Sequence, residues 1–491
     1  MNNHDYNELL SMSKDELKEL SQKEKTPDIY NENGKVNPGL LAKYYLEKSH
    51  IYKTKYSNTK FTTFYKYSYT KGYYVKVIDS DIYGDLCDIV MSNDPKHYTS
   101  NVIESAKKYI VSTSKVKEIS PEKWNEDVKR INFENGILDI DTFKLYSHSP
   151  FMLFNSQIPV EWNESMNECP NFDKLIGDLT SGDSEVIELI FEFIGAVISN
   201  IPVKQFKQAL FFIGAGDTGK SVLLQFLKWL LGDLFVGKNL QQINTQFGVY
   251  DLYGKRLAGC AEMTDEHIDN LGNFNALCAS DPIQAEPKGK QAITIQYTGF
   301  MLFIGNNMPT FSGVKDDAVY RRMLIYESKM KSIPPELQDP NLLDKIKLEA
   351  PAILKKSLRA LKETLTKRNG KFIQPGVIRE SVKNYRKINS LPITFYEECC
   401  RAREPDEIIK GEVNKATNIY NYFIVWCKKQ GITNAQIPKK KALKNELIIH
   451  LKCDEKDFIK KSCGEDYYPF VLTEECKEDF LREEEKKYSH Y

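Results

Sequence analysis

The stretch that decides the fold is ALFFIGAGDTGKSVLLQFLKWLLG, residues 209–232. A short apolar run stops at GAGDTGKS, and apolar residues then return with helical spacing. This pattern predicts a buried strand, a tight loop and a helix. The loop matches Gly-x-x-x-x-Gly-Lys-Ser in full, a sequence whose backbone N–H groups surround phosphates in nucleotide-binding proteins.

Each part of this loop has an expected role. The two outer glycines permit the tight backbone, and Lys220 should reach the β- and γ-phosphates of a nucleotide. The Ser221 hydroxyl should ligate Mg²⁺. We therefore expect ATP and Mg²⁺ as cofactors, with the nucleotide bound by Gly214, Ala215, Gly216, Asp217, Thr218, Gly219, Lys220 and Ser221.

Composition limits the rest of the chain. Its 491 residues are too many for one ordinary core, so several domains are expected. The 68 basic and 68 acidic side chains give zero net charge, so nucleic-acid binding must come from local basic patches. The 10 cysteines are scattered without a Cys-x-x-Cys pair, which indicates reduced thiols and neither a zinc site nor a disulfide framework.

The most apolar helix candidate is VIELIFEFIGAVISNIPV, residues 186–203. It contains Glu188 and Glu192, so we expect a packed helix and no membrane span. Asp183 is its expected N-cap, and Pro202 should end it. The polar amino-terminal sequence argues against a signal peptide. Together these features predict a cytoplasmic protein without membrane contact.

The region before the loop is expected to be mixed α+β. FTTFYKYSYTKGYYVKV (61–77) alternates aromatic and polar residues around Lys71-Gly72, which is typical of a β-hairpin. Aromatic residues interleaved with lysine also suit a base-stacking surface, although a half-buried sheet is the favoured interpretation. A helix is expected from Asn101 to Val111, and a turn between short strands at Asn135-Gly136.

Polar residues end two later strand candidates. RLAGCAEMTDE (256–266) is an apolar run that ends in Glu262, which could coordinate the metal's water shell or polarise an attacking water. GFMLFIGNNMP (299–309) ends in Asn306-Asn307, where a carboxamide could sense the nucleotide. Both residues are therefore candidate site residues.

Cations mark two more motifs. In ASDPIQAEPKGKQAITIQY (279–297) strand-like flanks surround Lys288-Gly289-Lys290, which predicts a hairpin tip. The tip could grip phosphates in the channel of a ring-shaped motor, or it could be an ordinary charged turn. After it, Arg321 and Arg322 offer one arginine finger toward a neighbouring subunit's nucleotide and one structural ion-pair partner.

Beyond Pro334 the chain is mostly helical, with LLDKIKLEAPAILKKSLRALKETL (342–365) as a helical pair or one broken helix and a hinge at Gly370–Pro375. The last unit should contain helices in residues 418–431 and 438–451 and a hairpin at Tyr467–Leu472. Basic residues that begin the second helix could contact DNA or form a solvated face. They are Lys439, Lys440, Lys441 and Lys444.

Taken in this order, the motifs resemble those of the superfamily 3 helicases, in the phage and plasmid branch of primase-helicases. The resemblance is carried by GAGDTGKS, RLAGCAEMTDE, SDPIQAEPKGK, IGNNMP and YRR, and it extends over roughly residues 60–400. It implies an AAA+ type ATPase that assembles as a hexameric ring with ATP sites at subunit interfaces. The stretch before the motor is too short for the polymerase-type primase domain of many relatives, so we expect no primer synthesis.

The resemblance also implies a role for individual residues. Lys288 and Lys290 would contact single-stranded DNA, and Ser221 and Glu262 would hold the metal. One of the two arginines would be the finger. The residues with catalytic roles would be Lys220, Glu262, Asn306, Arg321 and Arg322.

The sequence thus predicts a multi-domain α/β protein with an AAA+ type P-loop ATPase core. The expected parts are a mixed α+β domain (1–175), an ATPase domain with a helical lid (176–375) and a small winged-helix-like DNA-binding domain (376–491). The predicted function is an ATP-dependent replicative DNA helicase and replication initiator of a mobile genetic element. An origin-binding ATP switch that assembles on DNA without processive unwinding is the alternative. Expected partners are single-stranded DNA, origin duplex and further copies of the chain.

Overall fold

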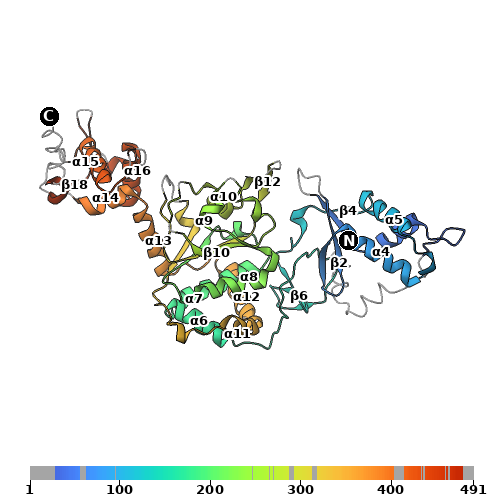
Figure 1. Ribbon diagram of the computed structural model, residues 1–491. Helices are drawn as coiled ribbons and strands as arrows, with labels where there is room; N and C mark the ends of the chain where they lie inside the picture. Colours follow the sequence, from blue (N-terminus) through green and yellow to red (C-terminus); the bar gives the residue numbers. More distant parts are fainter. Residues whose placement is uncertain are drawn as a thin grey trace. The chain divides into compact units, whose positions relative to one another are not determined.

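The chain forms two compact units. Both contain helices and strands, which Figure 1 labels along the chain. The first comprises residues 1–263, 272–306 and 327–375, and the second 264–271, 307–326 and 376–491. The three-domain division expected from the sequence stays a prediction. This computed structural model describes residues 28–55, 62–93, 95–245, 247–264, 266–268, 270–286, 292–311, 318–402, 414–432, 434, 437–458, 460–462 and 465–478.

The described part of the first unit begins with a four-stranded sheet of order β3-β2-β1-β4 and the helices α3, α4 and α5. The apolar faces of the helices share one core with Phe64 and Val77 of the sheet. The hairpin expected around Lys71-Gly72 and the helix expected from Asn101 are confirmed. The elements are α3 (Pro38–Lys48), β1 (Ile51–Lys55), β2 (Thr62–Ser68), β3 (Tyr73–Val77), α4 (Asp79–Asn93), α5 (Ser100–Ser112) and β4 (Lys117–Glu118).

A three-stranded antiparallel sheet follows, formed by β5 (Arg130–Phe133), β6 (Gly136–Asp139) and β7 (Leu145–Tyr146). The turn between short strands is confirmed one residue earlier than expected, at Glu134-Asn135, and Gly136 begins β6. Gly136 has φ +156°, and a Cβ there would lie 2.5 Å from the Tyr146 carbonyl oxygen. The close approach of the third strand therefore requires glycine at this position.

A pair of packed helices supports the centre of the first unit. The side chain of Asp183 caps α7 (Ser184–Ile198) by accepting from the Glu185 and Val186 N–H groups, as expected. α7 packs against α12 (Ala350–Lys367), and a Cβ on Gly195 would lie 2.4 Å from the Ser357 carbonyl oxygen. α11 (Leu342–Leu348) and α12 form the predicted helical pair, and α6 (Pro170–Thr180) precedes α7.

The carboxylate of Glu192 shows that α7 is a packed helix, as predicted. Its side chain is fully buried, forms an ion pair with Arg368 and accepts a hydrogen bond of 2.9 Å from the Ile373 N–H. A buried charge is tolerated where it is paired in this way. Among the described helices, none is both long and apolar enough to cross a bilayer.

The central sheet of the first unit is parallel. β8 (Ala209–Ile213), β13 (Phe300–Gly305), β10 (Leu257–Met263) and β9 (Phe235–Gly237) pair in that order. β14 (Met323–Glu327) is the strand in which the division between the two units falls. β8 and β13 are buried throughout, which explains their continuous apolar sequences. The helices α8 (Lys220–Leu231), α9 (Leu240–Ile243) and α10 (Gly272–Ala279) connect the strands, and the predicted strand–loop–helix at 209–232 is confirmed.

Arg256, which directly precedes β10, is a buried arginine of the first unit. Its guanidinium donates to four carbonyl oxygens, including Ala196 at 2.8 Å and Val197 at 3.2 Å in the last turn of α7. The C-terminal end of a helix favours a cation because its last carbonyl groups lack intrahelical partners. Burial lowers the pKa of Arg256 to about 10.

The second unit has a helical core with two small strand pairs. The helices expected in residues 418–431 and 438–451 are confirmed as α15 and α16. The hairpin expected at Tyr467–Leu472 is wrong: β17 pairs with β16, and β18 pairs with β15, because Phe470 and Leu472 are buried in the core. The elements are α13 (Gly376–Ile388), α14 (Leu391–Cys399), β15 (Cys400–Ala402), α15 (Ala416–Lys429), α16 (Lys440–Leu451), α17 (Glu455–Phe458), β16 (Lys460–Ser462), β17 (Glu465–Tyr467) and β18 (Phe470–Leu472).

Candidate functional site

The parallel strands bring three predicted site segments to one edge of the sheet. Gly305, the last residue of β13, pairs with Ile213 of β8 and with Met263 of β10. The glycine-rich loop after Ile213, Asn306 after Gly305 and Glu262 before Met263 therefore lie at the same edge of the sheet. Neighbouring strands are ~4.8 Å apart, so Asn306 lies about one strand spacing from the glycine-rich loop and Glu262 about two.

The loop Gly214–Ser221, here called the glycine loop, is shaped by its two outer glycines. Gly214 has φ +151°, and a Cβ there would lie 2.9 Å from the Ser328 carbonyl oxygen. Gly219 has φ +89°, and its Cβ would lie 2.9 Å from Leu175 Cδ1. A larger residue would be strained at either position. Both glycines are thus required by the local structure, as the sequence predicted.

A segment that sequence reasoning missed tethers the glycine loop. This segment, Ser328–Ile333, is here called the strap. The Ser332 hydroxyl donates to the Gly216 carbonyl oxygen at 2.8 Å, and the Ile333 N–H donates to the Asp217 carbonyl oxygen at 2.9 Å. The carbonyl groups of Gly216 and Asp217 therefore point toward the strap. In a trans peptide the C=O and N–H groups point in opposite directions, so the N–H groups of the residues that follow them point away from the strap. No sequence motif marks the strap.

Lys220 is buried within the glycine loop, with 5% of its surface exposed. Its ammonium group donates to the carbonyl oxygens of Gly214 (2.9 Å) and Ala215 and to the Thr218 hydroxyl (3.3 Å). Burial lowers the pKa of Lys220, and the charge of Asp217 partly opposes this effect. Lys220 is also the first residue of α8, where N–H groups make the helix end positive. This arrangement favours an anionic ligand at the loop.

Glu262 and Asn306 are both exposed at this edge of the sheet. The pairing of β10 with β13 shifts register between Cys260 and Met263, so Glu262 lies in an irregular part of its strand. A carboxylate and a carboxamide beside an anion-binding loop could orient water against a bound phosphate. Their catalytic roles stay predictions.

The two arginines belong to the second unit and differ in their surroundings. Both lie in a short 3₁₀ turn, Tyr320–Arg322, directly before β14. Arg321 is exposed, whereas Arg322 is half-buried and donates to the Ala318 carbonyl oxygen at 2.7 Å. The arginine with the accessible side chain is therefore Arg321.

The strands of the hairpin predicted around Lys288-Gly289-Lys290 are confirmed. β11 (Pro282–Ala285) and β12 (Ile293–Gln296) pair antiparallel, with Ala285 opposite Ile293. Lys288 and Lys290 at the expected tip lie outside the described residues.

The four lysines at the start of α16 have different environments. Lys439 and Lys441 are exposed. The ammonium group of Lys440 donates to the Thr417 hydroxyl at 2.9 Å, and that of Lys444 forms an ion pair with Glu455 at 2.6 Å. Two of the four predicted DNA contacts are thus available to solvent, and two have protein partners.

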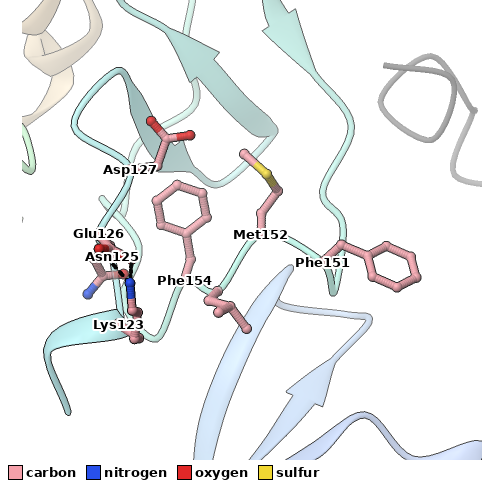
Figure 2. A pocket seen from close by; sticks show the side chains of 8 residues that line it. Lys123, Asn125, Glu126, Asp127, Phe151, Met152 and Phe154 are labelled. Carbon is pink, nitrogen blue, oxygen red and sulfur yellow. Dashed lines mark hydrogen bonds and ion pairs between the residues drawn. The ribbon is translucent and has the colours of Figure 1, made fainter. Parts of the chain in front are cut away.

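A hollow of about 150 Å³ lies elsewhere in the first unit. No motif had indicated it. Figure 2 shows its polar and apolar walls, with Lys123 beside Glu126 and Asp127 near Phe154. Lys123 and Glu126 form an ion pair of 2.7 Å, which compensates their charges. The lining residues are Lys123, Asn125, Glu126, Asp127, Phe151, Met152, Leu153 and Phe154.

Fold and site together define an α/β protein whose parallel sheet carries a glycine loop suited to an anion. Comparison with protein families gives two partial matches. Residues 40–181 match the family described as "D5 N terminal like". Residues 212–322 match a family of unknown function, DUF5906. The first match covers the sheets before the glycine loop, and the second runs from β8 to Arg322.

Solved structures of the NrS-1 C-terminal region are similar to this chain over most of its length. Two apo structures of that region have TM-scores of 0.46 and 0.45, and a third has 0.41. Each is 13% identical and covers 89% of this chain, with 99% or 100% of the other chain matched. At this level of similarity nothing about function follows.

Proposed function

We propose that this protein is an ATP-dependent DNA helicase that drives, and helps to start, replication of a mobile genetic element. The observation that supports the proposal most directly is the glycine loop between β8 and α8, with Glu262 and Asn306 at the same edge of the sheet. The D5 N-terminal-like match of residues 40–181 supports a replication-associated protein of the D5 type. The sequence resemblance to superfamily 3 helicases supplies the finer assignment.

The residues of the glycine loop fit a nucleotide with its metal. Lys220 would exchange its loop carbonyl partners for phosphate oxygens, which carry full negative charge and are stronger acceptors. The Ser221 hydroxyl, in the first turn of α8, would ligate Mg²⁺, and Glu262 would hold the metal's water shell. Mg²⁺ would neutralise charge on the phosphates. The residues that would surround the phosphates are Gly214, Ala215, Gly216, Asp217, Thr218, Gly219, Lys220 and Ser221.

Hydrolysis needs a proton acceptor and donors around the phosphate. The carboxylate of Glu262 would accept a proton from the attacking water, and the Asn306 carboxamide would orient that water. Arg321 is the better candidate for the finger because its side chain is exposed, whereas that of Arg322 is half-buried. In this proposal Arg321 acts on the nucleotide of a neighbouring subunit in a hexameric ring.

Movement of DNA would use the β11–β12 hairpin. Lys288 and Lys290 at its tip would contact phosphates of one strand in the channel of the ring. The strands of this hairpin, β11 and β12, are paired over their full length. The second unit would add contacts to origin duplex through a winged-helix-like fold. Lys439 and Lys441 are the better candidates there, because Lys440 and Lys444 have protein partners.

Strand displacement on forked DNA tests this proposal. Wild type should unwind the fork with ATP, Lys220→Ala should not, and the double variant Lys288→Ala/Lys290→Ala should lose both unwinding and stimulation by single-stranded DNA. Lys228→Ala, which changes an exposed lysine of α8, is the control for loss of a surface charge. Negative-stain images with ATP and DNA should show rings.

The same experiment separates the alternative, an origin-binding ATP switch. This alternative is supported by the second unit, because Lys439 and Lys441 are exposed on it and could bind origin duplex. If wild type hydrolyses ATP but never unwinds, and the hairpin variant keeps its stimulation by DNA, the helicase proposal fails. Retention of origin duplex by Lys220→Ala would then support the switch.

A further inference from the structure

The two faces of the amino-terminal sheet are built differently. One face, with Phe64 and Val77, packs against helices. The other face has aromatic rings in contact with one another: Tyr67 and Tyr74 have ring centroids 5.2 Å apart, and Tyr74 and Trp124 have centroids 5.1 Å apart. These three rings are buried and form an ordinary core. The half-buried sheet favoured by the sequence is thus confirmed for them.

The aromatic row continues past the core to the surface. Tyr69 contacts Tyr67 at a centroid distance of 5.0 Å, and His50 contacts both Tyr69 (6.3 Å) and Phe151 (5.7 Å). Tyr69 is 44% exposed and Phe151 is 40% exposed. Figure 2 shows the ring of Phe151 turned away from Met152 and Phe154. We call His50, Tyr69 and Phe151 the aromatic patch.

The aromatic patch is held in place by backbone contacts. The Tyr67 N–H donates to the His50 carbonyl oxygen at 2.9 Å, and the Gly72 N–H donates to the Ser68 carbonyl oxygen at 2.7 Å. A pre-ordered pair of exposed rings can stack on flat ligands with little loss of side-chain entropy. Scattered single apolar residues are normal on a surface, whereas rings in mutual contact form a continuous ligand-sized area.

Two exposed lysines, Lys71 and Lys117, lie beside the aromatic patch. Glu126 and Asp127 line the hollow next to Phe151, and both carboxylates are paired, with Lys123 and Arg130 respectively. Lys117 is paired in register with Tyr52, and Tyr52 contacts Tyr74 on the aromatic face, so Lys117 lies on that face and Glu118 on the other. Burial, together with the charge of Lys117, lowers the pKa of His50. Lys71 is exposed in the turn next to Tyr69, and within the described ranges neither lysine forms an ion pair.

We propose that the aromatic patch binds single-stranded nucleic acid, with unstacked bases on Tyr69 and Phe151 and backbone phosphates at Lys71 and Lys117. Exposed rings beside cations are the combination that single strands require, since every base has a flat face and every phosphate a charge. A protein partner would use the rings but would not need the two lysines. The inference deepens the proposed function by giving the strand a second contact, and it does not depend on ATP hydrolysis.

Fluorescence anisotropy with labelled dT20 and U20, without nucleotide, tests the patch in the full chain. Tyr69→Ala and Phe151→Ala should each weaken binding about fivefold or more, and Tyr69→Phe should bind as wild type does. Lys71→Ala and Lys117→Ala should reduce the dependence of affinity on salt. Tyr109→Ala, which removes a tyrosine that is 39% exposed on α5, is the matched control and should have no effect. Binding of a duplex of the same length should be unchanged in all variants.

Photochemical cross-linking to dT20 locates the contact directly, and mass spectrometry should find the adduct on the peptides of Tyr69 or Phe151. Unchanged affinity in both alanine variants, no binding by wild type, or a change only in self-association would overturn the inference. These results are distinct from failure of the proposed function. A wild type that binds through the aromatic patch but never hydrolyses ATP would contradict the helicase and leave the patch in place.

Discussion

Arg256 and Lys220 are both buried cations of the first unit, and both donate mainly to backbone carbonyl groups. Within the described residues neither forms an ion pair with a carboxylate. They differ in their position on helices. Arg256 lies at the carbonyl end of α7, where a cation is stabilised, whereas Lys220 lies at the N–H end of α8, where a cation is disfavoured.

The position at a helix end distinguishes a cation that stabilises the fold from a cation that can bind a ligand. Four of the five N–H groups of the Arg256 guanidinium donate to carbonyl oxygens, and the side chain is buried away from any ligand. The Lys220 ammonium group and the N–H groups of its loop are all donors, and an anion would relieve this local excess of positive charge. The comparison therefore predicts that Arg256 serves stability and Lys220 serves binding.

The largest expected effect is on catalysis. Lys220→Ala should lower ATP hydrolysis at least about 100-fold, because one charged donor to the phosphates is lost. The measurement is the steady-state rate of phosphate release with Mg²⁺. Lys228→Ala, which changes an exposed lysine of the same helix, should retain the wild-type rate. Equal losses in both variants would show that the effect comes from charge on α8 in general.

Arg256→Met should mainly affect stability. It leaves several buried carbonyl groups without donors, so the free energy of unfolding of the first unit should fall by about 3 kcal/mol or more. Urea unfolding followed by tryptophan fluorescence checks this value. The same measurement on Lys220→Ala should show a change below about 1 kcal/mol, because its carbonyl partners at the loop can reach water. A larger loss for Lys220→Ala than for Arg256→Met would reverse the comparison.

The buried carboxylate of Glu192 tests whether burial decides how much an ion pair contributes to stability. Glu192→Ala removes a fully buried carboxylate and leaves Arg368 with one partner fewer, so a loss of about 3 kcal/mol is expected. Glu188 also pairs with Arg368, at 3.1 Å, but its side chain is 39% exposed. Glu188→Ala should therefore cost below about 1 kcal/mol in the same unfolding experiment. Similar losses would show that burial of the pair does not decide its contribution.

The strap predicts a moderate effect on binding. Ser332→Ala removes one hydrogen bond to the glycine loop, so ATP affinity should weaken about fivefold, which corresponds to about 1 kcal/mol. Ser332→Thr keeps the hydroxyl and should restore affinity. Because Ser332 itself is exposed, the thermal midpoint should change little. A change in the turnover number with unchanged affinity would contradict a positioning role for Ser332.

The last prediction concerns the dependence of ATP affinity on pH. Burial lowers the pKa of Lys220 in the free protein, and a bound polyphosphate would raise it. Between the two pKa values binding takes up a proton, so ATP affinity should fall as pH rises, by at most about tenfold per unit. Lys220→Arg should remove this alkaline decline, since arginine stays charged. A decline of the same slope in Lys220→Arg would assign it to another group.

The glycine loop and its strands could be predicted because their sequence carries local physical requirements. Two glycines separated by four residues, a continuous apolar run and a Lys-Ser pair are visible in the sequence, and the structure places both glycines at positive φ. The strap could not be predicted, because Ser332 and Ile333 reach the loop from a segment more than 100 residues away in sequence. The hairpin at Tyr467–Leu472 failed because strand partners depend on which apolar residues enter the core.

The aromatic patch shows the same limit. The alternation in residues 61–77 predicted the hairpin, but it could not decide which rings are core and which are exposed. That distinction depends on Trp124 and Phe151, which cover or extend the aromatic face from later segments.

Equilibrium binding of ATP to the full chain tests the central claim most directly. A fluorescent ATP analogue should bind wild type with Mg²⁺, be displaced by unlabelled ATP, and fail to bind Lys220→Ala while Lys228→Ala binds normally. The folded state of each variant is checked by its unfolding midpoint. Equal affinity of wild type and folded Lys220→Ala, or no binding to either, would contradict the assignment of the glycine loop as the nucleotide site.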